Sequence, residues 1–276
     1  MKKEIILLTE DSVSARVLAN SIIMQNLDLK GIIVQQKAPG IPINKEIYKG
    51  NLIKIVLRKV MPKKFYRKLS HLKEHLQVKK IRKIEKKLRE QANDFLLKHL
   101  GQKANSTWPS QVEVLRVSSI NAEESYNFLI GAKPELLVVY GTSILQNQII
   151  EIPKFGVLNA HHAILPDYKG NFVEFWQVYN RDYDKVGITI HFIDAGVDTG
   201  DIIFQKKLNK ITTPNPYLLS ALNKIQILNN YPTVIKSVLN GTAKRRKQGN
   251  SLLPSYRLSD ITMEKKWELY TRQDYN

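Results

Sequence analysis

Three polar side chains in the second half of the chain are suited to acyl transfer. Asn159 and His161 lie two residues apart at the end of an apolar run, and Asp198 lies in a Gly-rich loop just after another apolar run, Val186–Ile193. An amide can donate a hydrogen bond to a developing oxyanion, an imidazole can carry a proton, and a carboxylate can orient the imidazole. Gathered at strand ends, these groups can transfer an acyl group to a nitrogen or an oxygen.

Each of these residues also has an ordinary structural interpretation. Asn159 can be a loop amide, His161 a half-buried histidine, and Asp198 a turn former between two glycines. We expect His191 to be a packed structural histidine and His162 to fill space beside the N-x-H motif. The spacing of these residues alone therefore leaves both interpretations open.

Alternating apolar and amphipathic stretches predict the elements that position these residues. The expected strands are Glu4–Leu8, Leu29–Gln35, Val112–Val117, Glu135–Tyr140, Phe155–Leu158, Val186–Ile193 and Asp201–Gln205. The expected helices are 12–26, Ala122–Ile130, Asn171–Asn180 and Tyr217–Leu239, with Ser12 and Asn121 capping the first two. This alternation is typical of an α/β, Rossmann-like fold, a mostly parallel sheet covered by helices. Such sheets bind ligands at the carboxyl ends of their strands, where Asn159 lies.

Positive charge is concentrated in one segment. The net charge is +18, and residues 41–104 hold 15 Lys and 4 Arg against 4 Glu and 1 Asp. Apolar residues recur every three to five positions from Leu69 to Phe95, and Leu52–Val60 mixes apolar residues with cations. We expect a basic helical hairpin that interrupts the alternation after the second strand, with its bend near Met61-Pro62.

The sequence leaves three roles open for this hairpin. Its cations can lie on an anionic membrane surface, grip RNA phosphates, or form a solvated face on helices that pack against the core or a second subunit of a homodimer. The hairpin has few aromatic residues for base stacking (Phe65, Tyr66 and Phe95), which argues against nucleic acid.

Composition narrows the class of protein. The 276 residues predict a catalytic domain over 1–240, with the insertion inside it, and a C-terminal extension over 241–276. The absence of cysteine excludes disulfides and thiolate metal sites and favours the reducing cytoplasm. The four apolar residues Ile5–Leu8 are too few for a signal peptide. The sequence contains no run of about 18 apolar residues, so no membrane-spanning helix is expected. The six His lack ligand spacing, so no metal is expected.

Five short motifs follow one another in order. They are N-x-H at Asn159–His161, L-P-x-Y-K-G at Leu165–Gly170, E-F-W at Glu174–Trp176, G-I-T-I-H-F-I-D at Gly187–Asp194 and G-V-D-T-G at Gly196–Gly200. This string resembles the folate-dependent formyltransferases, which include glycinamide ribonucleotide, methionyl-tRNA and sugar N-formyltransferases. The resemblance is strong over Ser118–Gln205 and holds only in outline over residues 1–37. His162-Ala163 departs from it, since Gly or Pro and then Ser often follow the histidine in this family.

The resemblance implies an activity and a site. Asn159, His161 and Asp198 fall on the family's catalytic positions, and the formyl donor would be N10-formyltetrahydrofolate. The folate would lie along the loop after the Glu135–Tyr140 strand, with the loop that begins at Asp194 closing the other side. The matching loop positions are Tyr140, Gly141, Thr142, Ser143, Ile144 and Leu145. The alternative for this loop is an ordinary strand-to-helix connection.

The acceptor amine is inferred by elimination. Glycinamide ribonucleotide enzymes hold a phosphate on a Gly-rich loop after the first strand, whereas Thr9–Ser14 has no glycine and two carboxylates. Methionyl-tRNA enzymes add a C-terminal barrel, for which we expect the 37 residues after Leu239 to be too few. We therefore expect an amino sugar carried on a nucleotide, as in surface-glycan synthesis. The alternatives are a methionyl-tRNA formyltransferase-like enzyme, or a membrane- or nucleic-acid-binding protein on an inactive fold.

Overall fold

The computed structural model describes residues 3–36, 63–208 and 211–272. In these ranges seven strands form one sheet, in the order β3-β2-β1-β4-β5-β6-β7. The bounds are β1 Glu4–Glu10, β2 Asp28–Gln35, β3 Glu113–Val117, β4 Leu136–Tyr140, β5 Val157–His161, β6 Gly187–Phe192 and β7 Ile202–Lys207. Strands β1 to β5 pair in parallel, and β6 and β7 add to β5 as antiparallel strands. The predicted mostly parallel α/β sheet is confirmed.

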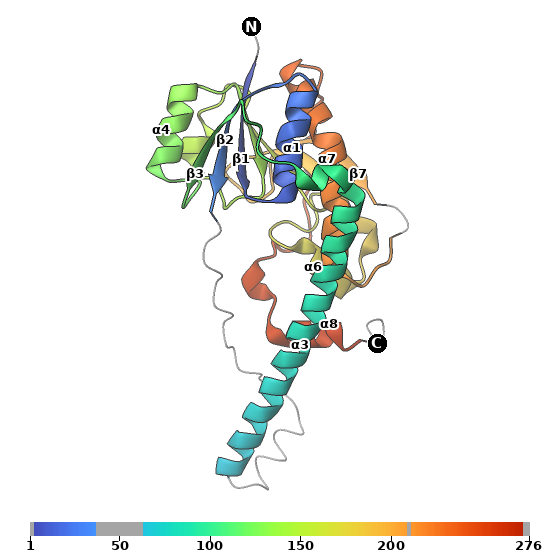
Figure 1. Ribbon diagram of the computed structural model, residues 1–276. Coiled ribbons are helices and arrows are strands. Elements are labelled where there is room, and N and C mark those ends of the chain that lie inside the picture. Colours follow the sequence, from blue (N-terminus) through green and yellow to red (C-terminus); the bar gives the residue numbers. More distant parts are fainter. Residues whose placement is uncertain (1–2, 37–62, 209–210, 273–276) are drawn as a thin grey trace.

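Helices cover both faces of this sheet (Figure 1). Their bounds are α1 Val13–Met24, α3 Lys63–Leu100, α4 Glu123–Ala132, α5 Asn147–Ile150, α6 Val173–Asn180, α7 Pro216–Leu239 and α8 Met263–Tyr270. Side chains alternate along β1, so Ile5 packs in the core under α1 and α7, and Ile6 packs in the core under α4. Both cores are buried, which fixes the register of the strands that carry the site.

The capping predictions had different outcomes. Ser12 caps α1 as expected, because its hydroxyl oxygen accepts a hydrogen bond from the Ala15 N–H at 3.1 Å. The prediction for Asn121 is wrong, since Ala122 occupies the N-cap position of α4 without a side-chain bond. The Asn121 amide instead bonds to the loop that follows β4.

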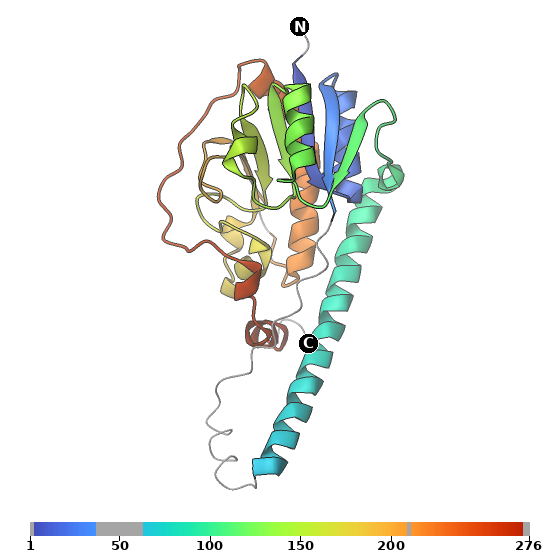
Figure 2. The same cartoon turned by 90° about the vertical axis from the view of Figure 1, so that its left-hand side faces the viewer.

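Helix α3 corrects the expectation that the basic segment stands outside the alternation. Its last turns bury Ala92, Leu96 and Leu100 in the same core as the sheet. Parallel strands need a crossover, and α3 is part of the connection from β2 to β3. At 1.5 Å per residue its 38 residues span about 57 Å, and its N-terminal half projects beyond the sheet (Figure 2). The expected first arm of the hairpin, Leu52–Val60, and its bend at Met61-Pro62 lie outside the described residues.

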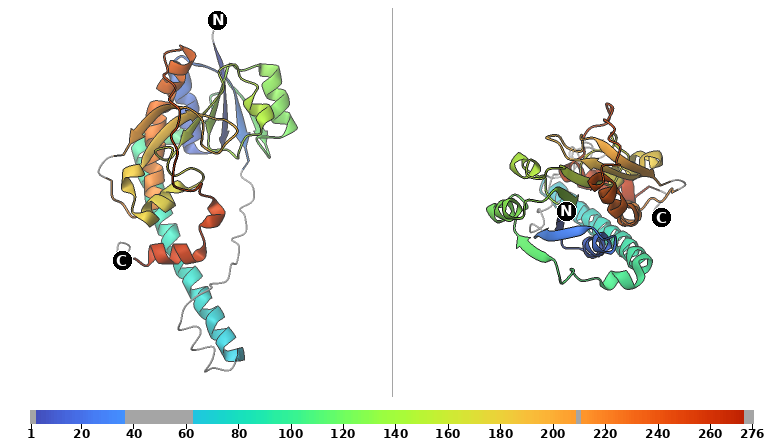
Figure 3. Two further views of the ribbon diagram at one scale, coloured as in Figure 1. Left: turned by 180° about the vertical axis from the view of Figure 1, so that it is seen from behind. Right: turned by 90° about the horizontal axis from the view of Figure 1, so that it is seen from above.

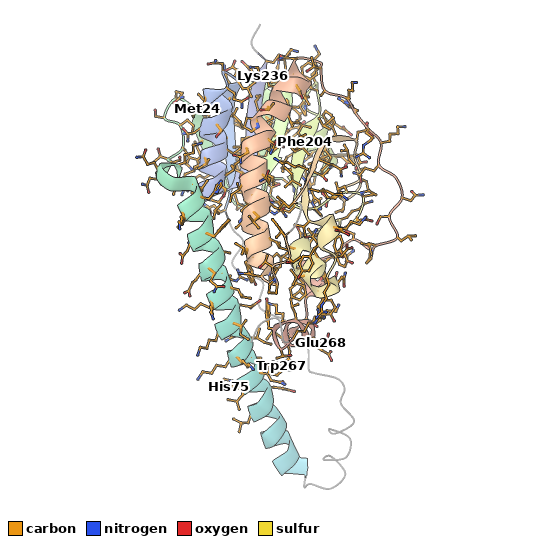
Figure 4. The ribbon with its side chains drawn as sticks, turned by 90° about the vertical axis from the view of Figure 1, so that its right-hand side faces the viewer. Met24, His75, Phe204, Lys236, Trp267 and Glu268 are labelled. Atoms are coloured by element: carbon orange, nitrogen blue, oxygen red, sulfur yellow. The ribbon has the colours of Figure 1, made fainter. Side chains whose placement is uncertain are left out.

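The segment after α7 returns along the molecule towards α3 (Figure 3, left). It makes isolated β-bridges from Arg246 to Ile202 and from Tyr256 to Gly170. Helix α8 then packs on α3, where Trp267 lies under the Lys80 ammonium (Figure 4). Within the described ranges, no helix is long and apolar enough to cross a bilayer.

Candidate active site

A cavity of about 490 Å³ opens where β1, β4 and β5 end. Its volume lies in the range of small-molecule sites. Every site residue expected from the sequence lines it, so the structure brings the whole predicted set together. That set is Asn159, His161, Asp198, Tyr140, Gly141, Thr142, Ser143, Ile144, Leu145 and Asp194.

The strand geometry explains the N-x-H spacing. Strand β5 was expected to end at Leu158, but its pairing with β6 continues to His161. Residues two apart on a strand point to the same face, so Asn159 and His161 face the cavity together. The loop between β6 and β7 brings Asp198 to them, and its Oδ2 lies 3.5 Å from His161 Nδ1. We call Asn159, His161 and Asp198 the Asn–His–Asp trio.

His191 joins this trio, although the sequence suggested only a packed residue. It lies opposite Asn159 in the β5–β6 register and is 1% exposed. Its Nε2 lies 3.2 Å from Asn159 Nδ2 and 3.4 Å from Asp198 Oδ1. It therefore packs as expected and also holds two members of the trio in place. The sequence shows only that His191 lies on a predicted strand; its place opposite Asn159 comes from the β5–β6 register.

The L-P-x-Y-K-G motif positions both titratable members of the trio. The Tyr168 carbonyl accepts a hydrogen bond from His161 Nε2 at 2.8 Å, and the Gly170 N–H donates to Asp198 Oδ2 at 2.8 Å. Gly170 has φ = 101°, and a Cβ there would lie 2.0 Å from the Tyr256 carbonyl oxygen. Only glycine fits this approach between the motif and the C-terminal segment.

The C-terminal segment also braces the Asp198 loop. The Gln248 side-chain amide donates to the carbonyls of Asp198 and Gly200, at 3.0 and 2.7 Å. Asp198 itself has φ = 53°, an uncommon conformation for a residue other than glycine. Such backbone persists where surrounding contacts over-determine it, as they do here.

Burial dominates the electrostatics of the trio. It lowers the pKa of His161 below its ordinary value of 6.5, and the charge of Asp198 opposes part of that shift. Burial alone would raise the pKa of Asp198, but His161, His191 and the Gly170 N–H outweigh it and hold that pKa well below its usual range. Near neutral pH this gives a carboxylate beside a neutral imidazole. The bond to Tyr168 places the imidazole proton on Nε2, so the lone pair at Nδ1 faces Asp198.

The loop after β4 is held from behind by β1. The Thr9 hydroxyl donates to the Tyr140 carbonyl at 2.6 Å, and the Glu10 N–H donates to the Gly141 carbonyl at 2.9 Å. Two further residues, which the sequence did not assign to the site, hold the same loop. Gln35 accepts from the N–H and hydroxyl of Ser143, at 3.2 and 2.9 Å.

Asn121 is the second of these residues. It donates to the Ile144 carbonyl and accepts from the Gln146 N–H, both at 2.9 Å. The loop is thus fixed by three different elements before any ligand binds, which favours recognition through its backbone. No local pattern in the sequence reveals these contacts, because they join residues far apart in the chain.

Apolar side chains flank the slot between this loop and the Asp198 loop. Ile144 is 73% exposed on one rim and Val197 is 43% exposed on the other. Leu145 and Ile193 line the slot between them. Asp194 organises the second rim, because its Oδ1 accepts from the Gly196 N–H at 3.1 Å and the Thr199 hydroxyl at 2.6 Å. A flat ring with polar edges fits such a slot.

Several separate elements supply the rest of the cavity lining. Its polar side chains include Glu10 and Ser12 near the end of β1, His162 after β5, Glu174 on α6, and Ser220 and Lys224 on α7. Phe172 adds an aromatic ring. In the described part of the chain, no group of three His, Asp or Glu side chains could hold a metal ion.

Comparison with known proteins agrees with this geometry. The family model described as formyl transferase matches residues 75–220, just over half of the chain. The chain belongs to the formyltransferase family. A curated methionyl-tRNA formyltransferase from Desulforamulus reducens is 36% identical over 101 residues, which are 36% of this chain and 31% of that protein. The chain therefore spans about a third of the length of this relative.

Solved formyltransferases share the fold. A 4-N formyltransferase from Francisella tularensis superposes with a TM-score of 0.56 at 17% identity, over 94% of this chain and 78% of that one. An N-formyltransferase from Helicobacter canadensis, solved with folinic acid and dTDP-3-aminofucose, gives a TM-score of 0.53 at 17% identity, over 100% and 83%. At these identities the likeness concerns the fold alone.

Proposed function

We propose that this formyltransferase moves a formyl group from N10-formyltetrahydrofolate to a primary amine, and that the amine belongs to a sugar carried on a nucleotide. The observation that carries the proposal is the convergence of the Asn–His–Asp trio and the Tyr140–Leu145 loop on one cavity. The rigid backbone of that loop and the apolar rims suit the pterin ring of a folate. The donor supplies an activated formyl carbonyl when bound.

The trio acts on the atoms that change charge during attack by the amine. Asn159 is placed to donate a hydrogen bond to the formyl oxygen as it becomes negative. The His161 Nδ1 lone pair and the Asp198 carboxylate form a pair of acceptors 3.5 Å apart for the proton that the amine loses. His161 then returns a proton to the leaving nitrogen of the folate. Holding the amine and the formyl group together supplies further acceleration.

A sugar nucleotide acceptor is supported by features of the segment at the end of β1. The loop after β1 offers Glu10 and Ser12 to the cavity, and it has no glycine to cradle a phosphate beside the formyl carbon. Asp11 in that loop is paired with Arg16 and Arg116 on the outer side. The Helicobacter canadensis structure, which contains dTDP-3-aminofucose, gives a precedent in the same fold.

Methionyl-tRNA is the second candidate acceptor. The curated relative from Desulforamulus reducens is a methionyl-tRNA formyltransferase by its name, and its 36% identity to this chain is higher than the 17% of the solved Helicobacter canadensis enzyme. The deciding experiment incubates the protein with N10-formyltetrahydrofolate and, separately, a nucleotide-linked 3-amino sugar, a nucleotide-linked 4-amino sugar, glycinamide ribonucleotide and Met-tRNA. We expect turnover with an amino sugar. Turnover with Met-tRNA alone would overturn the sugar assignment, and no turnover with any amine would overturn the transferase assignment.

The projecting part of α3 supports a peripheral contact with an anionic membrane from the cytoplasmic side. Leu72 and Leu76, one turn apart, are each 56% exposed, and Lys79, Arg82 and Lys83 follow them as exposed cations. An apolar pair surrounded by cations suits an interface with anionic lipid. We expect co-sedimentation with vesicles that contain phosphatidylserine and little with neutral vesicles, and a clear loss in Leu72→Ser/Leu76→Ser. Equal sedimentation with both vesicle types would contradict this contact.

A further inference from the structure

A second carboxylate–imidazole pair lies in the cavity beside the trio. His162 Nδ1 is 2.7 Å from Glu174 Oε1, the hydrogen-bonding distance of a charge-assisted pair. The Glu174 side chain is 2% exposed, whereas that of His162 is 21% exposed and lines the cavity. Glu174 is therefore reached from the cavity through the imidazole. The mechanism proposed above uses neither residue.

The surroundings of this pair fix its orientation. Burial alone would raise the pKa of Glu174, but His162, the Glu174 backbone N–H and Ser220 lower it overall, so the side chain is a carboxylate. A carboxylate only accepts, so Nδ1 of His162 carries the proton that bonds to it. The Asn223 amide also donates to the His162 carbonyl at 2.9 Å. In the neutral imidazole the other ring nitrogen, Nε2, is then a hydrogen-bond acceptor.

The position of the pair separates it from the donor. His162 bonds to Glu174 on α6 and lies 3.4 Å from the Ser220 hydroxyl on α7, whereas the apolar residues Ile144 and Val197 belong to the loops after β4 and β6. Phe172 has φ = 49° and stacks on Tyr217 at 5.1 Å between ring centroids. The cavity lining thus joins an oriented imidazole to a fixed aromatic ring. A sugar matches both features, because its hydroxyl groups can bond to the imidazole and the apolar face of its ring can pack on Phe172.

We propose that His162, oriented by Glu174, forms the acceptor subsite and accepts a hydrogen bond from a hydroxyl or amine of the sugar to be formylated. In this subsite Phe172 packs against the apolar face of the sugar ring. The inference rests on the proposed function, because it assigns the acceptor side of that reaction. His162 is a specificity-determining residue in this account, and Glu174 is a positioning residue that acts through it.

The test uses two substitutions of His162, each of which replaces only one of the two ring nitrogens with an amide. His162→Asn places an amide near Nδ1, keeps a partner for Glu174 and removes the group at Nε2. His162→Gln places an amide near Nε2. With the nucleotide-linked amino sugar that the wild-type protein formylates best, we expect the acceptor KM to rise about ten-fold in His162→Asn and less in His162→Gln, the scale of one lost hydrogen bond. The kcat at saturating acceptor should change less than three-fold.

Three controls make the result specific. Binding of 5-formyltetrahydrofolate, followed by tryptophan fluorescence, should stay within two-fold of wild type in both variants. Glu174→Gln should raise the acceptor KM and shift the Nδ1 proton signal of His162 in imidazole NMR spectra, which a merely structural loss would not do. His75→Asn, an exposed histidine of α3 outside the cavity (Figure 4), should change nothing.

The outcomes separate this inference from the function on which it rests. An unchanged acceptor KM in His162→Asn, with normal folate binding and an active wild-type protein, would overturn the acceptor subsite alone. A wild-type protein that binds no 5-formyltetrahydrofolate and formylates no amine would overturn the proposed function and the subsite together.

Discussion

The two walls of the cavity are built in different ways. The wall that we propose for the donor consists of two loops, Tyr140–Leu145 and the loop from Asp194 to Asp198, and the first is held by bonds from Thr9, Glu10, Gln35 and Asn121. The wall that we propose for the acceptor consists of side chains from α6, α7 and the segments before them. A loop whose backbone is held by hydrogen bonds from other elements keeps its shape when its own side chains change, whereas a wall of polar side chains changes with each substitution. One fold can therefore keep a donor and exchange acceptors.

Removing a member of the trio, which acts on both reacting groups, should give the largest loss of turnover. We expect Asp198→Ala and His161→Ala each to lower kcat by about 10³ or more, because proton transfer and orientation are lost together. Binding of 5-formyltetrahydrofolate and the circular dichroism spectrum should remain close to wild type. Near-normal turnover in either folded variant would show that the trio does not carry the reaction.

Asn159→Ala should separate charge stabilisation from binding. Loss of one donor to a developing oxyanion costs about 10² to 10³ in kcat. We expect the donor KM and the acceptor KM to change little, since the bond strengthens during reaction. Steady-state kinetics with each substrate varied in turn measures both. A variant with normal kcat and raised KM would place Asn159 in ground-state binding instead.

The pH profile should report the neutral form of His161. Burial lowers the pKa of His161 below 6.5, so the rate should fall as the imidazole gains a proton, with a midpoint below pH 6.5. One unit below the midpoint the rate should be about ten-fold lower. In Asp198→Asn, we expect the acid limb of the residual activity to lie at lower pH than in the wild type, because the Asp198 charge raises the pKa of His161. The measurement uses kcat at saturating amine, and a midpoint above 6.5 would contradict the assignment.

The smallest expected effect sharpens the contrast between the walls. Asn121→Ala removes two hydrogen bonds to the donor loop, and we expect the donor KM to rise about five-fold with the acceptor KM unchanged. His162→Asn should give the reverse pattern. If both variants altered both constants equally, the two walls would not be separate recognition surfaces.

The sequence predicted the parts of the site that are local. The succession of strands along the chain, the place of Asn159 and His161 at the end of one of them, and the loop after β4 follow from apolar runs and the ordered motifs. The contacts that hold these parts are not local. Asn121 was interpreted as a helix cap, because its partners at Ile144 and Gln146 are far along the chain.

The same reason explains the other differences. His162 and Glu174 were both visible near the motifs, but their contact joins the end of β5 to α6 and needs the fold to form. The C-terminal segment was expected only as an extension, whereas Gln248 and Tyr256 hold the backbone of Asp198 and Gly170. The apolar stripe of α3 was visible in the sequence as far as Phe95, but nothing local shows that Ala92, Leu96 and Leu100 pack in the same core as the sheet, so the segment was read as an insertion.

A single-turnover transfer of a ¹³C-labelled formyl group is the most direct test of the proposed chemistry. Excess protein is mixed with [¹³C-formyl]-N10-formyltetrahydrofolate and a nucleotide-linked amino sugar, and the formamide signal of the sugar is followed by NMR. We expect the label to reach the sugar nitrogen with wild-type protein and to stay on the folate with His161→Ala. Label that reaches the sugar equally fast with both proteins would contradict the account.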